Sequence, residues 1–134
     1  MSIEIPNYFF KVPYKGSCYP GSPKLGDFRE GANCQVFVYQ LLVHLGYPLL
    51  PDFRSSDLWE DSIYTTSTTA IQAFDILFWN KTTTAWGAHI GLALDANQVI
   101  HLSRENGFAV IWPLERFLEK APYKFFLGAK RPMH

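Results

Sequence analysis

Apolar side chains repeat at helical spacing in one segment in the first half of the chain. From Cys34 to Leu45 they return every three or four positions, as Phe37 and Leu41 do, and this spacing is typical of a helix. Asn33 is a preferred N-cap residue, and Gly46 is the usual residue just beyond a helix C-terminus. Because the segment is apolar on most sides, we predict a helix at the centre of the fold, with Phe37 and Leu41 buried.

The second half of the chain consists of short runs rich in β-branched and aromatic residues, separated by turn residues. We predict strands in these runs and a hairpin turn at 95–97. A short helix over 52–63 and a helical turn over 114–120 are also predicted, and the Gly- and Pro-rich segment 13–31 is typical of an irregular loop. Helices followed by an antiparallel sheet indicate an α+β fold with N-terminal helices packed on a central sheet. The predicted strands cover 76–79, 88–94, 98–102, 108–112 and 124–129.

Composition favours one globular domain. The 134 residues are 48% hydrophobic and 16% aromatic, so they can fill a core without disulfides, and we expect 1–134 to be a single domain. Twelve basic residues balance twelve acidic ones, which argues against nucleic-acid binding. No run is long enough for a membrane span, and no signal peptide is visible. We therefore expect a cytoplasmic protein, unless it is exported by an unsignalled route.

The two cysteines lie in different settings. Cys34 begins the predicted helix, where unpaired N–H groups and the helix dipole favour a thiolate, whereas Cys18 lies in the irregular loop. A buried structural thiol is the alternative for Cys34. We predict that Cys34 is the more reactive cysteine and that its pKa is depressed.

A thiol nucleophile needs a base, usually histidine, and a group that orients that base. His44 lies nearly three turns along the helix from Cys34, and His134 is the last residue of the sequence. His89 and His101 lie on two strands of one predicted hairpin, so they are the candidates. A hairpin loop of three or five residues places them on the same face of the sheet, whereas two or four residues place them on opposite faces.

Four ordered blocks carry a resemblance to a known family. They are Asn33-Cys34-Gln35-Val36, Phe74-Asp75-Ile76-Leu77-Phe78, His89-Ile90-Gly91-Leu92 and Val99-Ile100-His101. NlpC/P60 domains are similar in this order: a helix-initial Cys, a Gly-Asp strand, a His-(Val/Ile)-Gly strand and a second polar residue, often His. The Pro13-Tyr14 pair and the closing segment 127–131 also resemble that family, so the resemblance covers nearly the whole chain.

The resemblance implies a papain-like α+β fold and a cysteine hydrolase that cleaves an amide bond. Members of the family mostly act on peptidoglycan stem peptides, as endopeptidases or amidases. By the same resemblance, Cys34 is the nucleophile, His89 is the base and His101 orients the imidazole of His89. No metal or other cofactor is implied, and the expected partner is a peptide or peptidoglycan fragment.

The resemblance also places Tyr14, Asn33 and Gln35 against the substrate, with Tyr14 near the oxyanion. The family usually has Asp and Ser where this chain has Asn33 and Gln35, and Gly where it has Phe74. That Asp is associated with gripping a free substrate amine. Because an amide cannot form the same ion pair, we predict that this chain does not depend on a free N-terminal L-alanine.

Three alternatives remain open. A CHAP-like amidase would use Glu105 or Asn106 as the third catalytic group. An acyl- or amide-transfer enzyme on the same scaffold would act on a protein or lipid. A non-catalytic module would bind a glycan or peptide through its tryptophans, although core packing is the commoner role of such residues. The tryptophans are Trp59, Trp79, Trp86 and Trp112.

Overall fold

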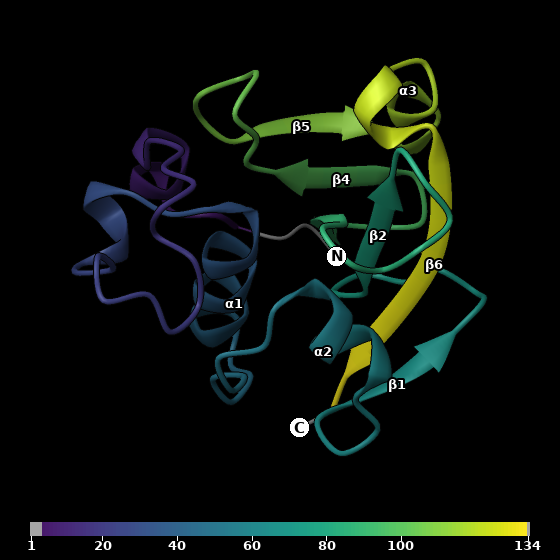
Figure 1. The fold of residues 1–134 in the computed structure, drawn as a ribbon, viewed down its shortest axis with the longest axis horizontal. Coiled ribbons are helices and arrows are strands. Elements are labelled where there is room, and N and C mark those ends of the chain that lie inside the picture. The colour runs from purple at the N-terminus through teal and green to yellow at the C-terminus, as the bar shows by residue number, and fades with distance from the viewer. Residues whose placement is uncertain (1–3, 134) are drawn as a thin grey trace.

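A six-stranded antiparallel sheet forms the centre of the fold, in the order β1-β6-β2-β3-β4-β5 (Figure 1). The computed structural model describes residues 4–133. The strands are β1 (Thr65–Thr68), β2 (Ile76–Asn80), β3 (His89–Ala93), β4 (Gln98–His101), β5 (Val110–Pro113) and β6 (Phe125–Pro132). The helices are α1 (Cys34–His44), α2 (Ser55–Glu60) and α3 (Leu114–Phe117), with 3-10 turns η1 (Asn7–Lys11), η2 (Phe28–Glu30) and η3 (Ala121–Tyr123). The predicted α+β class is confirmed.

The central helix α1 forms as its sequence predicts. The side chain of Asn33 accepts hydrogen bonds from the backbone amides of residues 35 and 36, which satisfies two of the four free donors at the helix start. Gly46 has a φ of 100°, the left-handed conformation expected just beyond a helix end. Phe37 and Leu41 are fully buried. The helix therefore begins and ends at the predicted residues and packs through its apolar side chains.

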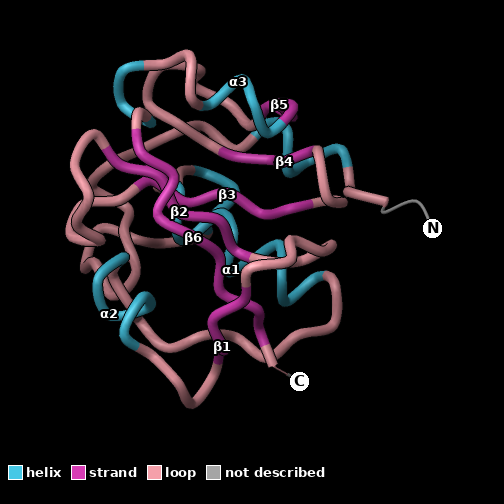
Figure 2. The backbone as a smooth tube through the Cα atoms, turned by 90° about the vertical axis from the view of Figure 1, so that its right-hand side faces the viewer, coloured by secondary structure: helices cyan, strands magenta, loops and turns pink. Residues whose placement is uncertain are grey.

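The two faces of the sheet bury different cores. On one face, even-numbered residues of β2, β3 and β4 pack with the apolar residues of α1. On the other face, odd-numbered residues of the same strands pack with Trp112, Phe117 and Tyr123 in a mainly aromatic cluster. In Figures 1 and 2, α3 lies beside β5, at the end of the sheet that carries this cluster. Because β2 is covered on both faces, its residues Ile76–Asn80 are all buried.

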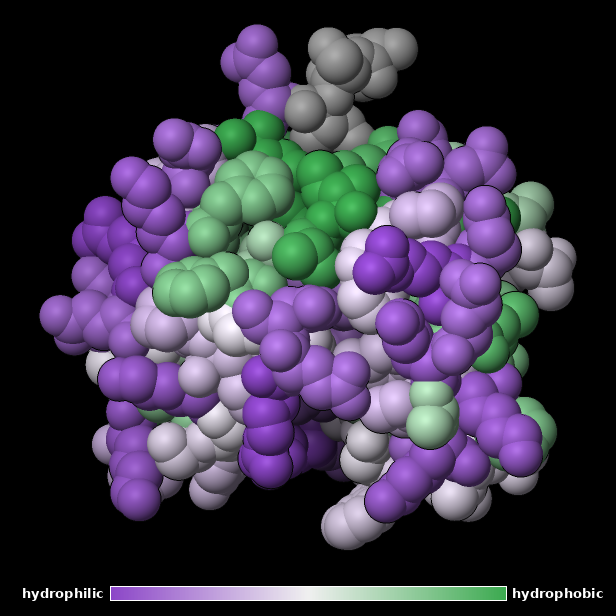
Figure 3. Space-filling view, turned by 90° about the horizontal axis from the view of Figure 1, so that it is seen from above, coloured by the Kyte–Doolittle hydropathy of each residue, from purple (hydrophilic) through white to green (hydrophobic). Residues whose placement is uncertain are grey.

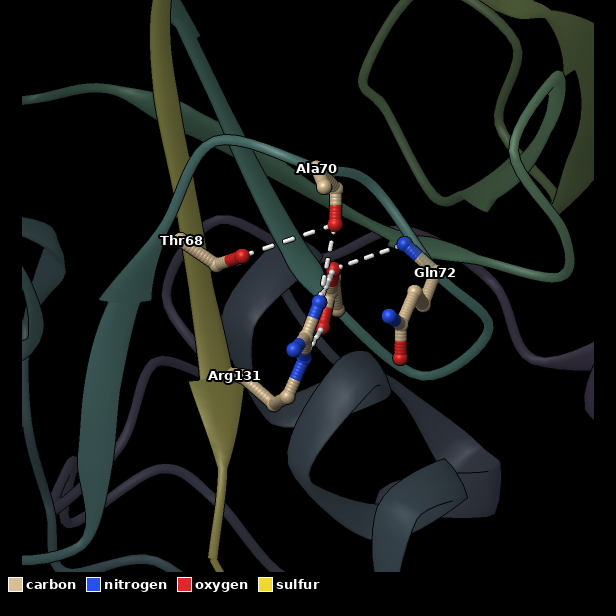
Figure 4. A network of polar contacts seen from close by, with 5 residues as sticks. Thr68, Ala70, Gln72 and Arg131 are labelled. Carbon is tan, nitrogen blue, oxygen red and sulfur yellow. Dashed lines mark hydrogen bonds and ion pairs between the residues drawn. The ribbon is translucent and has the colours of Figure 1, made fainter.

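An ion pair fixes the start of β2 to β6 (Figure 4). Asp75 is completely buried, and its carboxylate binds Arg131 through both oxygens, at 2.8 Å to Nε and 3.0 Å to Nη2. The backbone amide of Gln72 donates to the same carboxylate, and Arg131 donates to the carbonyl of Ala70. A buried carboxylate without these partners would cost several kcal/mol, so this network holds the turn before β2 in place.

The structure adds elements that the apolar pattern missed. Strand β1 is a run of Thr and Ser residues paired with the end of β6, which extends to Pro132. Lys130 on β6 is buried, and its ammonium group donates to the backbone carbonyls of Trp59 and Asp61 at the end of α2. The helix α2 is also shorter than the predicted segment 52–63. Strand β1 has so few apolar residues that it shows no alternation, so only its β-branched threonines indicate a strand.

The surface seen from above, on the side of β5 and α3, carries a patch of apolar side chains among hydrophilic ones (Figure 3). Phe108, which precedes β5, and Ile111, which lies in β5, are among the exposed apolar residues of the protein.

No helix within residues 4–133 is long and apolar enough to cross a membrane.

Phe74 occupies a strained backbone position. Its φ is 76°, and no other non-glycine residue among those described has a positive φ. The family described above usually has Gly at the matching position, and Gly adopts this conformation without a Cβ penalty. The ring of Phe74 packs edge-on against Tyr47 at 5.8 Å, and its amide donates to the carbonyl of Ala93. Ring packing and this hydrogen bond offset the strain.

We predict that Phe74→Ala is less stable than Phe74→Gly. Both variants lose the ring, but only alanine keeps the left-handed strain, which costs roughly 1–2 kcal/mol. Urea unfolding of the two variants measures this difference directly. A Phe74→Ala variant as stable as Phe74→Gly would show that the position carries no strain.

Candidate active site

Cys34 is the first residue of α1, and the backbone amides of the helix start lie around it. Asn33 satisfies the amides of Gln35 and Val36 through its side chain, and its carbonyl accepts from Phe37. Among the described residues, the amide of Cys34 has no such partner. The first turn therefore presents one free N–H at the cysteine itself.

The thiol of Cys34 lies between α1 and the start of β3. The backbone amides of Ile90, Cys34 and Gln35 act to lower its pKa, but burial is the larger effect and raises the pKa above the ordinary value of 9.0. The predicted depressed pKa is therefore wrong for the free protein. The position of Cys34 at the helix start was predicted correctly. However, burial of the thiolate raises the pKa by more than the helix amides lower it.

The β3–β4 hairpin brings His89 and His101 to one face of the sheet. Leu92 pairs with Ile100 and Ala93 with Val99, and the amide of Leu94 donates to the carbonyl of Gln98. The connecting loop is therefore the three residues 95–97, the case that puts both histidines on the same face. The carboxylate of Asp95 accepts from the amides of residues 97 and 98, which fixes this loop.

Gly91 creates the space that His101 occupies. It lies across the hairpin from His101, and a Cβ at this position would lie 2.7 Å from Cγ1 of Val99 and 3.2 Å from Cβ of His101. A larger residue would force these two side chains away from their positions. The φ of Gly91 is not positive, so its backbone conformation does not require glycine. The glycine of the His-Ile-Gly motif is therefore required for the space that it leaves.

The two imidazoles are joined by a hydrogen bond of 2.9 Å between Nε2 of His89 and Nδ1 of His101. Burial lowers the pKa of His101 to about 3. Burial, reinforced by the neighbouring His101, lowers the pKa of His89 well below the ordinary value of 6.5. Both rings are therefore neutral near pH 7. The bond uses Nε2 of His89 and leaves its Nδ1 for another contact.

Aromatic rings hold His101 in place. It is fully buried, with its ring centroid 4.4 Å from that of Trp112 and 4.6 Å from that of Phe117. Phe117 in turn stacks on Trp79 at 3.9 Å. Within residues 4–133, Nε2 of His101 has no hydrogen-bond partner, and the ring lies among aromatic side chains. This cluster fixes the orientation of the ring.

Tyr123 contacts the site in a way that the sequence did not predict. Its ring lies 4.7 Å from the ring of His89, and its hydroxyl is hydrogen-bonded to Ser103. Burial raises the pKa of Tyr123, and the charge of the Cys34 thiolate raises it further. Tyr123 therefore contacts His89 and interacts electrostatically with Cys34. It comes from the irregular segment before β6, where the sequence carried no motif.

Residues around α2 also support the site. The hydroxyl of Ser55 accepts from the amide of Ala88, just before His89. Arg54 lies with its guanidinium carbon 4.3 Å above the ring of Tyr19, and its positive charge acts to lower the pKa of Cys34. The Arg54-Ser55-Ser56 sequence loosely resembles an Arg-Thr-Ser segment of the family, and this was its only sequence signal.

Tyr14 reaches the site from the segment before η2. It pairs with Ala32 in an isolated parallel bridge, and its amide donates to the carbonyl of Gly107. Burial raises the pKa of its hydroxyl, as does the thiolate charge of Cys34, whereas a hydrogen bond from Arg104 lowers it. Tyr14 thus interacts electrostatically with Cys34, and its predicted place near the oxyanion stays a prediction.

Asn33 and Gln35 are 7% and 3% exposed. The amide nitrogen of Asn33 donates to the side-chain oxygen of Gln35 at 3.3 Å, while its oxygen caps α1. Both side chains are thus engaged with each other and with the helix start. The geometry shows a local structural role for both residues. Their contact with substrate stays a prediction.

Within residues 4–133, no hydrogen bond joins the remaining candidates to the histidine pair. Asn106, proposed for a CHAP-like site, donates to the hydroxyl of Ser103 and is exposed, as is Glu105. Cys18 is buried, with its thiol near the carbonyl of Lys24. Exposed His44 packs against Phe9. His134 lies outside the described residues.

The tryptophans do not form a common groove. Trp79 and Trp112 are buried, Trp59 packs on Phe78, and Trp86 alone is largely exposed, at 80%. Core packing therefore accounts for three of the four. Residues 4–133 contain no group of three or more His, Cys, Asp or Glu side chains that could hold a metal ion.

Comparison with known proteins supports the fold. The crystal structure of the NlpC/p60 domain of the peptidoglycan hydrolase SagA is similar, with a TM-score of 0.60 over 93% of this chain and 90% of that chain, at 19% sequence identity. The resemblance predicted from the four motif blocks is thus present in three dimensions, and the fold is that of an NlpC/P60 domain. No family model matches the sequence, and no curated protein matches it.

We predict that the alkylation rate of Cys34 rises steeply with pH and reaches its maximum only above the ordinary thiol pKa of 9.0. A thiol whose pKa is raised by burial leaves little thiolate at lower pH. Rates with iodoacetamide between about pH 5 and about pH 10, assigned by mass spectrometry, measure this. A fast plateau at mildly acidic pH would instead indicate a preformed thiolate–imidazolium pair.

The histidine pair should also make stability depend on pH. Both pKa values are lower in the folded protein, so the unfolded chain binds more protons below about pH 6.5. The contribution of the two histidines to the free energy of unfolding is fully present above that pH. It is lost as pH falls toward the folded pKa of His101, about 3. The loss should reach about 1.4 kcal/mol per pH unit for each histidine.

Urea unfolding over this range should give a shallower pH dependence for His101→Gln than for the wild type. The exposed His44 provides a matched control, and His44→Gln should keep the wild-type dependence. Equal pH dependence in all three proteins would contradict the burial of a neutral histidine pair.

Proposed function

We propose that this protein is a cysteine hydrolase that cleaves an amide bond in peptidoglycan stem peptides. The observation that carries this proposal is the 2.9 Å hydrogen bond between His89 and His101, together with the action of the Ile90 amide, next to His89 in β3, on the thiol of Cys34. A nucleophile, a base and a group that orients the base are the parts that amide hydrolysis by a thiol requires.

His89 acts as the base through Nδ1. Because its Nε2 is bonded to Nδ1 of His101, the productive tautomer has His89 donating its Nε2–H, which leaves Nδ1 unprotonated and able to accept the thiol proton. The resting pair is neutral, so the proton moves as the sulfur of Cys34 attacks the carbonyl carbon. The protonated His89 then gives that proton to the leaving nitrogen, and water releases the acyl group from the thioester.

The oxyanion of the tetrahedral intermediate is stabilised by donors at the helix start. The amide of Cys34 can serve this purpose, since Asn33 and the first helical bond engage only the next three amides. The hydroxyl of Tyr14 is the second donor, consistent with its interaction with the thiolate charge. Such preorganised donors are often the largest contribution to catalysis of acyl transfer.

Peptidoglycan is the substrate class that the similar structure supports, since that domain belongs to a peptidoglycan hydrolase. His101 at Nε2 of His89 also favours this triad over a CHAP-like one, in which Glu105 or Asn106 would hold that position.

Activity should fall in a defined order among three variants. Cys34→Ala should abolish hydrolysis of peptidoglycan fragments, and His89→Ala should lower its rate by roughly 10²–10⁴-fold. His101→Ala should keep more activity than His89→Ala, because His101 orients the base and does not transfer the proton. Mass spectrometry of the fragments after incubation measures all three, with Asn106→Ala as the control. Full activity of Cys34→Ala would refute the proposal.

A free substrate amine should not be required. Asn33 replaces the carboxylate that would bind it, and losing a charge-assisted bond costs on the order of 1–3 kcal/mol. We therefore expect matched free and N-acetylated stem peptides to be cleaved with similar kcat/KM. A strong preference for the free amine would contradict this expectation and would require another acid near the site.

A further inference from the structure

The two imidazoles of the site are held in different ways. The ring of His101 lies among aromatic rings, with Trp112 and Phe117 at 4.4 and 4.6 Å between centroids. The ring of His89 is held at one atom by its hydrogen bond to His101. That bond fixes Nε2, but the second side-chain torsion of histidine is soft, so the ring can still turn. The direction of Nδ1, through which His89 accepts the thiol proton, therefore needs a second contact.

Tyr123 supplies this second contact. Its ring centroid lies 4.7 Å from that of His89, with 30° between the two planes. Rings side by side in one plane would have their centroids farther apart, so these two rings meet face to face with an offset, a favoured aromatic arrangement. Within residues 4–133, no other Phe, Tyr or Trp ring comes as close to His89, and the next, Trp79, is 6.4 Å away. Tyr123 is thus the ring that sets the plane of the imidazole.

The main chain and the aromatic cluster hold Tyr123 itself in place. It is the last residue of η3, where Pro122 restricts the backbone and the amide of Tyr123 donates to the carbonyl of Lys120 at 3.0 Å. The residue is 4% exposed, and its ring lies 5.6 Å from that of Phe117 and 6.1 Å from that of Trp112. A ring packed in this way has little freedom of its own, so it can restrain the ring of His89.

The charge of His89 changes during the proposed reaction. Both imidazoles are neutral at rest, since burial lowers the pKa of each. As the sulfur of Cys34 bonds to the carbonyl carbon, an electron pair of the C=O bond moves to oxygen and the thiol proton moves to Nδ1 of His89. His89 is then a buried imidazolium until it gives this proton to the leaving nitrogen. Within residues 4–133, no carboxylate forms an ion pair with it.

An aromatic face can take the place of the missing carboxylate. The face of a tyrosine ring is the negative end of its quadrupole, and it attracts a cation within about 6 Å of the ring centroid. The ring of Tyr123 lies within this range of His89. The attraction is larger where water is excluded, as it is around this buried pair.

We propose that Tyr123 is the positioning residue of His89: its ring fixes the plane of the imidazole and stabilises the imidazolium that forms when Cys34 attacks. The proposal rests on the proposed hydrolase function and adds a fourth residue to its three. Because the imidazole is neutral before attack and charged during it, contact with the ring face favours the transition state over the ground state. The ring carries this role and the hydroxyl does not, since the hydroxyl is engaged by Ser103.

NMR of the free protein tests the contact without any substrate. The ring current of Tyr123 shifts the carbon-bound protons of the His89 imidazole upfield, so Tyr123→Leu should move these signals downfield and weaken the scalar coupling between His89 and His101. Tyr123→Phe keeps the ring and should keep both signatures. Unchanged His89 signals in Tyr123→Leu would overturn the positioning role.

Steady-state kinetics on a peptidoglycan fragment separate this role from simple packing. Tyr123→Leu should lower kcat roughly ten- to thirtyfold. It should leave KM unchanged, because the ring acts on the imidazolium of the transition state and not on the bound substrate. Tyr123→Phe should keep most of kcat. A loss in Tyr123→Phe equal to that in Tyr123→Leu would assign the effect to the hydroxyl and overturn the proposal.

Fluorinated phenylalanines at position 123 test the charge stabilisation. Added fluorine weakens the negative face of the ring and changes its size little, so kcat should fall stepwise from phenylalanine through trifluoro- to pentafluorophenylalanine. The same series at Phe78, a buried ring that packs on Trp59, should leave kcat unchanged. A flat series at position 123 would overturn the charge stabilisation. If Tyr123→Leu does not fold, this series decides the proposal.

Failure of the hydrolase function would have a different signature. If the wild type cleaves no peptidoglycan fragment, the hydrolase proposal fails, and the stabilisation of an imidazolium fails with it. The NMR signals of His89 still decide whether Tyr123 positions the imidazole. Normal cleavage by the wild type, together with unchanged His89 signals and unchanged kcat in Tyr123→Leu, would overturn the Tyr123 proposal alone.

Discussion

The hydrogen bond between His89 and His101 is the interaction on which the site depends. It exists because a three-residue loop sets the register of β3 and β4, so that both side chains leave the same face of the sheet. Gly91 supplies the space for His101, and an aromatic cluster with Trp112 fixes its ring. Loop length, glycine and aromatic packing thus all serve one contact of 2.9 Å.

Burial of this pair determines the chemistry available at Cys34. Desolvation raises the pKa of the thiol and lowers that of both imidazoles, so the resting site is neutral. A neutral site contains little Cys34 thiolate before a substrate carbonyl is in place. His89 then takes the thiol proton while the sulfur attacks.

The sequence predicted those parts that depend on local pattern. The cap at Asn33, the limits of α1 and the five apolar strands follow from periodicity and turn residues, and the motif order predicted the fold. Strand β1 was missed because its threonines form a sheet edge without an apolar face. The raised pKa of Cys34 was missed because a local sequence shows the helix start but not the depth of burial. Tyr123 could not be predicted, since its contact with His89 is set by packing between distant segments.

The most direct test of the account is nitrogen NMR of the two imidazoles in the free protein. The account predicts that His89 and His101 stay neutral well below pH 6.5, the ordinary histidine pKa. It also predicts a scalar coupling across the Nε2–H···Nδ1 bond, with the shared proton on Nε2 of His89 and the one N–H proton of His101 on its Nε2. Titration of either ring at its ordinary pKa, or the absence of a shared proton between the rings, would contradict it.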